Sequence, residues 1–508
     1  MTNNQNKQIA KNTLLLYARM LLLMIISLYT SRIIFKALGA SDFGLYNVVA
    51  GFVMMLSFLN SAMSNATQRY LSYELAKKDI YKLKKVFCQI QILHYIIASI
   101  VFIIGEIIGV WFLNEIMNIP NDRYFAANVV FQCSLVSTVF SIISVPYNAM
   151  LIAHENMKIF AYLGILEAIL KLLLCMVIYI VAYDKLIIYA ICLMLVSVTL
   201  QIIYRLYCRK YQETHFKYII EKKILKEICG YATWSLCGSL ATVANSQGIN
   251  IIINIFFNTT VNAARGIAYQ IDTVVRNFVS NFQTAMNPQI VKSFSLNDLD
   301  TMYKYIFWGS KLSFFILLIL TVPLIYNLQY LLHLWLGEVP NETIIFTQLV
   351  LINSLIVSLS GILSIAAQAT GKIKYYQITM GSLLLLNLPI AYILYQNKFP
   401  AYSVLIVSII IEAILVFVRL MFLKKMIQLK IIKYLLNVIK PTCICSILGF
   451  TICYYISLLI IGNSIISFIT AAFIQVVITV LLIYSIGLTQ NEQSIILNVI
   501  KKKLKRHE

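Results

Sequence analysis

The chain has 508 residues, of which 60% are hydrophobic and only 12% are charged. Soluble globular proteins carry about 25% charged residues, so this composition excludes a soluble domain and predicts a membrane protein with many spans. The formal net charge of +21 indicates basic cytoplasmic loops rather than nucleic-acid binding, because Lys and Arg are scattered in short clusters between apolar segments.

Fourteen apolar stretches are long enough, at about 20 residues each, to cross a bilayer as helices. The sequence therefore predicts an all-α polytopic membrane protein with about 14 transmembrane helices. The approximate bounds of the spans are residues 14–36, 43–64, 87–113, 125–152, 159–181, 186–206, 229–256, 262–285, 305–332, 344–369, 377–396, 402–422, 441–461 and 465–487.

The distribution of Lys and Arg gives the orientation of these helices. With both termini placed in the cytoplasm, the inner segments hold 31 of the 41 basic residues and the outer loops hold 3. A missed or invented helix would invert every later loop, so the helix count and the orientation support each other. The remaining 7 basic residues lie in or at the edge of spans: Arg19, Arg32, Lys36, Lys171, Arg265, Arg276 and Lys311.

The first two spans form a predicted hairpin, with a tight outer turn at Leu38–Tyr46 in which Asp42 caps the second helix. Arg19 and Arg32 lie within the first span. They are 13 residues apart, hence separated by about 140° around the helix and about 20 Å along it, so they cannot form one clamp. Each either extends its charge to a membrane interface or contacts an anionic ligand.

Two sequence matches relate the halves of the chain. Ala62–Asn65 resembles Ala285–Pro288 at the exits of spans 2 and 8, and Ala153–Phe160 resembles Ala369–Tyr376 after spans 4 and 10. Because each half would hold six helices, the halves are predicted to be parallel repeats about an axis normal to the membrane. We expect two six-helix lobes plus two C-terminal helices; the predicted boundaries are 1–227, 228–440 and 441–508.

The eighth span carries the most polar residues. Arg265, Asp272, Arg276 and Gln283 are spaced 7, 4 and 7 apart and fall within about 40° of each other on a helix. Asp272 and Arg276 at i, i+4 are suited to a structural pair. One arginine would still lack a balancing carboxylate, so we favour a cavity-facing anion site.

The seventh span carries a neutral polar face formed by Gln247, Asn250, Asn254 and Asn258, at spacings of 3, 4 and 4. This face suits either a hydroxyl-rich ligand or amide hydrogen bonds between helices.

Carboxylates within spans are candidates for ion coupling, because in a low-dielectric setting they can hold a proton or a cation. These candidates are Asp272, Glu412 and Glu106. A structural role in ion pairs between helices is equally compatible with the sequence. The ten cysteines and the scattered histidines show no ligand spacing, so we expect no metal, no cofactor and no enzyme active site.

The order of these features resembles a known family. The motifs are Leu38-Gly39-x-x-Asp42-Phe43-Gly44-Leu45-Tyr46, Gln68-Arg69-Tyr70 after span 2 and Ala153-x-x-x-x-Lys158, together with fourteen spans. The chain resembles the polysaccharide flippases, in the O-antigen and capsule branch of the multidrug/oligosaccharidyl-lipid/polysaccharide exporter superfamily.

The resemblance implies alternating access that moves a polyprenyl-diphosphate-linked oligosaccharide from the cytoplasmic to the periplasmic leaflet of the bacterial inner membrane. Related lipid II flippases bind the diphosphate with arginines of helices 1 and 8, which correspond here to Arg19, Arg32, Arg265 and Arg276. Gln283, Asn250 and Asn254 would complete the substrate site. Partners would be the lipid-linked oligosaccharide and membrane lipids; docking of a polymerase or of glycosyltransferases is left open.

Three alternatives remain at this stage. An ion-coupled drug antiporter of the same superfamily would have twelve spans and an acidic cavity. A polytopic glycosyltransferase would need an acidic motif in a sizeable first outer loop, and a polysaccharide polymerase would need large outer loops. The fourteen spans, the arginines and the short outer loops favour the flippase.

Overall fold

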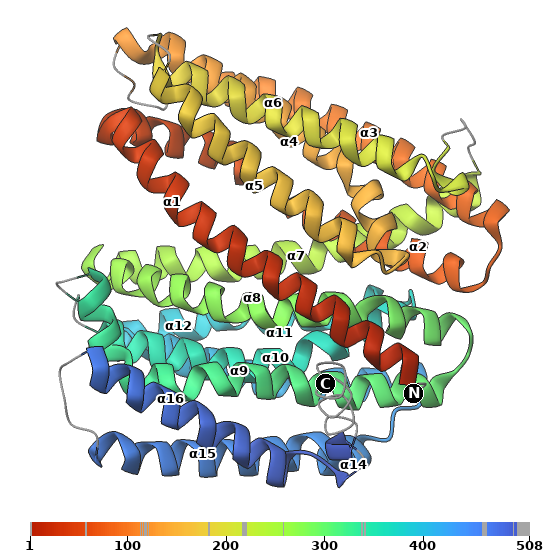
Figure 1. The fold of residues 1–508 in the computed structure, drawn as a ribbon, viewed down its shortest axis with the longest axis vertical. Coiled ribbons are helices and arrows are strands. Elements are labelled where there is room, and N and C mark those ends of the chain that lie inside the picture. Colours follow the sequence, from red (N-terminus) through yellow and green to blue (C-terminus); the bar gives the residue numbers. More distant parts are fainter. Residues whose placement is uncertain are drawn as a thin grey trace, which may run out of the picture. The chain divides into compact units, whose positions relative to one another are not determined.

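The computed structural model describes an all-helical protein (Figure 1). It covers residues 3–494 except 56–57, 112, 114, 116–118, 120, 181–182, 216–220, 258, 337–338, 340–341, 460–464 and 491; some side chains within the helices, including Arg32 and Asn254, also lie outside the description. The helices are α1 (Asn3–Met55), α2 (Phe58–Ala76), α3 (Ile80–Trp111), α4 (Tyr124–Ala153), α5 (Met157–Ile180), α6 (Lys185–Cys208), α7 (Lys222–Phe256), α8 (Thr259–Ser295), α9 (Leu299–Leu336), α10 (Thr343–Ala369), α11 (Lys374–Leu385), α12 (Asn387–Gln396), α13 (Ser403–Ile427), α14 (Ile431–Tyr434), α15 (Lys440–Leu459) and α16 (Ile465–Leu482).

Within the described part of the chain, eleven helical segments are long and apolar enough to cross a membrane. They correspond to all predicted spans except the first, second and eighth. The eighth, α8, has 37 residues but carries three charges within its central part, Arg265, Asp272 and Arg276, which lower its hydropathy. The predicted all-α polytopic membrane fold is confirmed.

The predicted outer turn at Leu38–Tyr46 is wrong in its secondary structure. Helix α1 continues through these residues to Met55, and the red ribbon in Figure 1 bends back at its upper left end. A straight helix of this length would extend about 80 Å, far beyond a bilayer. Gly39 and Gly44 suggested a break, but a glycine within a helix costs only about 0.5–1 kcal/mol and does not have to end it.

The exits of α2 and α8 lie later than predicted. Helix α2 runs to Ala76, so that Arg69 lies within it rather than after it, and α8 runs to Ser295. Each helix is followed by a residue in the left-handed conformation, Lys78 with φ 58° and Asn297 with φ 55°. The two exits therefore share one backbone geometry.

The short connections after α4 and α10 also match. Glu155 has φ 58° and Gly371 has φ 76°, and they lie 216 residues apart, which is the offset at which the surrounding sequences align. A left-handed residue two positions after the helix thus recurs in both connections. Both pairs of positions support the internal repeat.

The chain divides into two compact units, which we describe separately. Unit 1 comprises Met1–Leu240, Pro288–Asp298 and Gly371–Ile378, and unit 2 comprises Ala241–Asn287, Leu299–Thr370 and Thr379–Glu508. The units are defined by contacts and the predicted lobes by the repeat, so the lobe boundaries stay a prediction.

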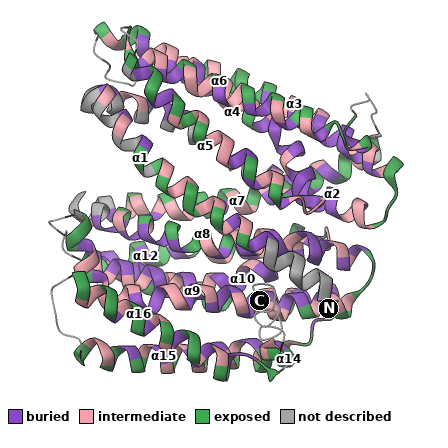
Figure 2. Ribbon diagram, in the orientation of Figure 1, coloured by how far each residue is buried: buried purple, intermediate pink, exposed green. Residues whose placement is uncertain are grey.

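In unit 1, α4 packs against α2, α3 and α6. Two glycines let α3 approach α4 closely: a Cβ on Gly105 would lie 2.5 Å from a methyl group of Leu135, and one on Gly109 would lie 2.1 Å from the Phe131 ring. In unit 2, α10 packs against α9 and α13, while α15 and α16 pack against α9. Figure 2 shows buried residues, in purple, along these packed helices. Pro389 lacks the backbone N–H that would donate a hydrogen bond to the carbonyl of Leu385, and the helix is interrupted at Leu386, between α11 and α12.

An ion-pair cluster joins three predicted outer connections within unit 1. Arg123 lies 2.5 Å from the carboxylate of Asp42 and 2.5 Å from that of Asp184. Asp42, which is buried, therefore pairs with a cation instead of capping a second helix as predicted. Asp184 in turn caps α6 through the backbone N–H groups of Leu186 and Ile187.

Arg123→Ala would leave two carboxylates close together without their shared cation. Charge-assisted hydrogen bonds of this kind contribute roughly 1.5–3 kcal/mol. We therefore expect a lower thermal unfolding midpoint for the variant in detergent, partly restored when Asp42→Asn is added. The control is Lys185→Ala, which removes an exposed cation at the start of α6. Equal midpoints for Arg123→Ala and the control would show that the cluster contributes no stability.

Candidate functional site

The polar residues of α8 divide between its inner and outer sides. Arg265 is 4% exposed and Asp272 is 2% exposed, whereas the Arg276 side chain is 47% exposed. The four predicted residues lie within about 40° of each other around α8, as their spacing requires. This range includes the border between the packed side of the helix and its exposed side. The four residues consequently meet different surroundings.

Arg265 is held by neutral groups of α7. Its guanidinium donates to the side-chain oxygen of Asn250 and, at 3.5 Å, to the carbonyl of Ser246, and it lies 4.5 Å from the centre of the Tyr269 ring. It forms no ion pair with any residue that the structure describes, and its buried Nε forms no hydrogen bond. Among the described residues of unit 2, the positive charge is therefore oriented by neutral groups and is not paired with a carboxylate.

Asp272 and Arg276 form the i, i+4 pair that their spacing suggests, with 3.6 Å between nitrogen and oxygen. Asp272 also accepts a hydrogen bond from the hydroxyl of Ser354 on α10. This geometry supports the prediction that Asp272 and Arg276 form a structural pair. Arg276, on the exposed side of α8, keeps donors that no hydrogen bond among the described residues accounts for.

A second pair lies on α13. Arg419 is 3.8 Å from Glu412 and donates to the hydroxyl of Ser360 on α10 at 2.8 Å. Arg276 also lies within electrostatic range of Glu412. Two carboxylates and two guanidiniums from α8 and α13 therefore form one balanced network alongside the serines of α10.

Gln283 lies at the junction of α8, α9 and α10. Its amide donates to the hydroxyl of Ser313 and to the carbonyl of Ser358, both at 3.1 Å. It also packs against Gly361, where a Cβ would lie 2.3 Å from its oxygen. These contacts connect helices, and they use both hydrogens of the amide.

Asn250 on the neutral face of α7 forms two side-chain hydrogen bonds. Its oxygen accepts one from Arg265, and its amide nitrogen donates one to the side-chain oxygen of Gln247 at 3.1 Å. Of the other predicted members, the side chain of Asn254 and the whole of Asn258 lie outside the described residues. The role of this face as a bridge between helices therefore has support at Asn250.

Arg19 belongs to unit 1, whereas Arg265, Arg276 and Gln283 belong to unit 2. Its guanidinium lies 4.4 Å from the centre of the Phe160 ring on α5 and packs against Gly164, where a Cβ would lie 2.2 Å from its Nε. The Nε atom is buried and forms no hydrogen bond among the described residues. Arg19 therefore points across to α5 instead of extending along α1 to an interface. Arg32, the other predicted cation of α1, has a side chain outside the described residues.

Glu106, which has no partner on its own helix, accepts a hydrogen bond of 3.0 Å from Gln132 on α4. Each of the three predicted coupling carboxylates thus has a polar partner, namely Gln132, the Arg276 and Ser354 pair, or Arg419. Among the described residues, no three His, Cys, Asp or Glu side chains are grouped as a metal site would require.

Sequence patterns missed two further pairs. Lys311 on α9 lies 2.5 Å from Glu492, and Glu155 lies 2.5 Å from Lys292. The partners are 181 and 137 residues apart, so no helical spacing could reveal them. A buried lysine in a span and an acidic residue in a short inner connection were the available indications.

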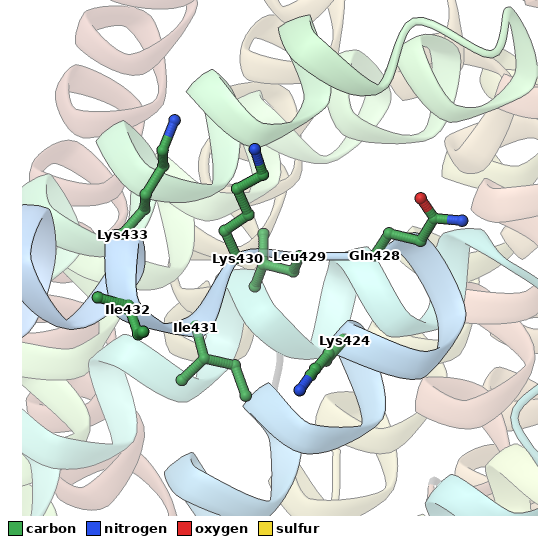
Figure 3. A pocket seen from close by; sticks show the side chains of 7 residues that line it. All are labelled: Lys424, Gln428, Leu429, Lys430, Ile431, Ile432 and Lys433. Carbon is green, nitrogen blue, oxygen red and sulfur yellow. The ribbon is translucent and has the colours of Figure 1, made fainter.

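A surface hollow lies at the connection between α13 and α14. It is lined by Lys424, Gln428, Leu429, Lys430, Ile431, Ile432 and Lys433. Figure 3 shows that Lys430 and Lys433 point to one side and Lys424 to the opposite side, so the three cations do not converge on one point. The hollow lacks the geometry of an anion clamp.

Comparisons with known proteins agree with this architecture. A family model described as "Polysaccharide biosynthesis protein" matches residues 9–294, which is more than half of the chain. A search of curated proteins finds no match.

Several solved transporter structures share the fold. An outward-facing multidrug resistance MATE family transporter of the MOP superfamily matches with a TM-score of 0.74 and 14% identity, over 84% of this chain and 96% of that chain. A MOP superfamily transporter from Pyrococcus furiosus, described as having a binding pocket of reverse polarity that suggests a different function, matches with a TM-score of 0.71 and 14% identity over 83% and 96%. A MATE structure in the straight conformation gives 0.71 and 14% over 84% and 96%.

At such identities the structures establish the fold, and the family match establishes the family. The predicted resemblance is confirmed: the chain belongs to the polysaccharide biosynthesis protein family and has the fold of the MOP superfamily transporters.

Proposed function

We propose that this protein is a flippase that moves a polyprenyl-diphosphate-linked oligosaccharide from the cytoplasmic to the periplasmic leaflet of the bacterial inner membrane. The observation that carries the proposal is Arg265, a buried guanidinium fixed by neutral partners within a transporter fold. Membership in the polysaccharide biosynthesis protein family supports the same reading.

The chemistry of the substrate explains why such a cation would be kept. A diphosphate is far too polar to cross hydrocarbon without compensation, whereas a polyprenyl tail can remain in the lipid throughout. A guanidinium matches phosphate oxygens through two parallel hydrogen bonds and is less strongly hydrated than an ammonium group. Arg265 forms no ion pair with the described residues, and its Nε forms no hydrogen bond to them.

We assign Arg276, Arg19 and Arg32 to the same role at other depths. Arg276 has an exposed side chain beside its pair with Asp272. Arg19 is oriented by stacking on Phe160. Cations at several depths would let a diphosphate exchange one partner for the next, so that no step leaves it uncompensated. Gln283, Asn250 and Asn254 would support the site.

Coupling to an ion is assigned to Asp272, Glu412 and Glu106. Asp272 and Glu412 share the network that contains Arg276 and Arg419. An incoming diphosphate would compete with these carboxylates for the guanidiniums, and a freed carboxylate would then take up a proton or a cation. We propose both termini in the cytoplasm, which follows from the distribution of basic residues.

The fold itself favours one alternative, an ion-coupled drug antiporter, because the multidrug MATE transporters share it. Cationic drugs would require a site with exposed carboxylates. Asp272 and Glu412 are both paired with arginines here, which makes an anionic ligand the better match. A polytopic glycosyltransferase or polymerase finds no such support in the transporter fold.

Deletion of the gene should trap lipid-linked oligosaccharide in the cytoplasmic leaflet, because the diphosphate and the glycan cannot cross unaided. The measurement is the leaflet distribution of labelled lipid-linked oligosaccharide, with periplasmic modification of the sugar as the readout. An ethidium efflux assay in the same strains tests the antiporter. Periplasmic sugar appearing at the normal rate, or loss of ethidium efflux alone, would refute the proposed function.

Arg265→Ala should reduce the flipping rate at least tenfold, since a charge-assisted bond contributes about 1.5–3 kcal/mol. Arg265→Lys should recover only part of the rate, because an ammonium group lacks the bidentate geometry. The matched control is Lys171→Gln, which removes an exposed cation paired with Glu167 on α5. With expression and melting temperature confirmed for each variant, a normal rate for Arg265→Ala would show that Arg265 is structural.

A further inference from the structure

One side of α8 is polar over about two thirds of the hydrocarbon thickness of a bilayer, which is roughly 30 Å. Gln270, Thr273, Asn277 and Ser280 are exposed, and Thr284 continues the same line one turn later. Their spacings of 3, 4, 3 and 4 keep them within about 80° around the helix. From Gln270 to Thr284 the line extends about 20 Å. We call these five residues the α8 polar face.

Other helices show that exposure alone does not produce such a face. The exposed positions along α3 and α13 are almost all large and apolar, as a surface in contact with lipid requires. A row of amides and hydroxyls in contact with lipid would be costly at each position. The α8 polar face therefore meets water or a polar ligand. The exposed apolar residues used for comparison are Ile96, Ile100, Ile103 and Ile107 on α3, and Ile406, Ile410, Ile414, Phe417 and Met421 on α13.

The side chains of the α8 polar face are uncharged and can both donate and accept hydrogen bonds. Thr273 donates to the carbonyl of Tyr269 at 2.7 Å and Thr284 donates to that of Ser280 at 2.8 Å. A threonine hydroxyl used in this way still offers oxygen lone pairs to a partner, and the amides of Gln270 and Asn277 can both donate and accept. Sugar hydroxyls have the same dual capacity. A phosphate only accepts, so it would not be matched by the acceptors of this face.

We propose that the α8 polar face contacts the glycan of the transported lipid, and that the arginines contact its diphosphate. This division rests on the proposed flippase function. It assigns neutral saccharide recognition to Gln270, Thr273, Asn277, Ser280 and Thr284, residues distinct from the charged set. A face made of short hydroxyls and amides tolerates different sugars, because it holds no fixed charge that would favour or reject one ring.

Cysteine accessibility tests the face directly. Ser280→Cys, in a background in which the native cysteines are replaced, should react with a membrane-impermeant maleimide at least tenfold faster than Ile410→Cys on α13. Lipid-linked oligosaccharide extracted from the same cells should slow the Ser280→Cys reaction severalfold, and polyprenyl diphosphate without sugar should not.

Each other outcome overturns this assignment. Equal reaction rates at the two cysteines would place the face in lipid. Protection by the sugar-free lipid would show that the diphosphate or tail, not the glycan, covers it. Absence of protection by either lipid would leave a water-lined face without a glycan contact. A failed leaflet assay alongside labelled, glycan-protected Ser280→Cys would refute flipping while keeping the binding face.

A second and independent observation concerns the connections that follow α4 and α10. The carboxylate of Glu155 accepts hydrogen bonds from Gln289 at 2.6 Å and Lys292 at 2.5 Å, both on the last turns of α8. Glu155 is largely buried in this contact. All three residues belong to unit 1, although α8 begins in the second half of the sequence.

The repeat-related positions make the reciprocal contact. Arg69, on α2, lies against Gly371 in the connection after α10, where a Cβ would lie 2.3 Å from its guanidinium nitrogen. Its guanidinium also packs on the rings of Tyr70 and Tyr231, at 4.6 and 5.2 Å from their centres. The helix end of each half thus docks on the short connection of the other half. In the internal repeat, position 155 corresponds to position 371, at an offset of 216 residues. Position 69 corresponds to position 292, at an offset of 223 residues.

We infer that these two contacts form a reciprocal latch that closes the cytoplasmic side of the transporter. The basic-residue distribution places both connections on that side. The contacts of Glu155 are polar and lie at a helix end, where an ion pair can separate in a conformational change. Arg69 adjoins a buried cluster that includes Tyr231 and Ile373. Release of Glu155 and Arg69 would then free the ends of α8 and α2 from the short connections after α4 and α10, all of which belong to unit 1.

Lys292→Gln weakens the latch at one of its two points. In inverted membrane vesicles, labelling of Ser280→Cys from the cytoplasmic side should rise at least threefold in this variant. The charge exchange Glu155→Lys with Lys292→Glu should return labelling toward the parent rate. Lys304→Gln, which alters an exposed lysine at the start of α9, serves as the control.

Unchanged labelling in Lys292→Gln would overturn the latch, as would an equal rise in the control. A lower melting temperature without altered labelling would assign the Glu155 contact to stability alone. The reading is independent of the substrate, so it stands or falls apart from the flippase proposal.

Discussion

The cost of holding a charge away from water governs the polar architecture of this protein. A carboxylate or guanidinium inside a membrane has to find a partner, reach an interface or border a water-filled space. Within the described residues, the carboxylates of α8 and α13 follow the first course, since Asp272 meets Arg276 and Glu412 meets Arg419. Arg265 and Arg19 have no ion pair among these residues, and neutral or aromatic groups hold them instead. Among the described residues, the charge without an ion pair on α8 is therefore positive, and so is that of Arg19 on α1; Glu106 on α3 is a carboxylate without an ion pair and accepts a hydrogen bond from Gln132 instead.

That sign is the most informative property for function. A cavity built for cationic drugs would leave its acids available, whereas a cavity built for a diphosphate would leave its arginines available. The network on α8 and α13 could present either available arginines or available acids. An anion that competes for the arginines would release the carboxylates with which they are paired. Such an exchange would link binding of the lipid headgroup to uptake of a coupling ion, and it needs no charge beyond those already present.

The sequence predicts the fold better than the site. Hydropathy locates most spans to within a few residues, since a segment such as α10 has few other ways to satisfy its backbone. The turn predicted at Leu38–Tyr46 is wrong, because a glycine permits a break in a helix without requiring one. The partner of Asp42 could not be predicted either, since Arg123 lies 81 residues away. The stripe on α8 was visible in its spacing, but the border between its packed and exposed sides depends on where α7 and α10 lie. Lys311 with Glu492 and Glu155 with Lys292 are matched only by the tertiary fold.

The internal repeat shows how one backbone can support two chemistries. Glu155 and Gly371 occupy the same left-handed position, which glycine adopts freely and glutamate adopts at some cost. Glutamate at this position brings a carboxylate that can bind Lys292, while glycine leaves room for the broad guanidinium of Arg69 to approach the backbone. One contact is therefore an ion pair, and the other depends on shape and aromatic stacking. Salt acts mainly on the first contact, so the two contacts of the proposed latch would be released with different sensitivities to ionic strength.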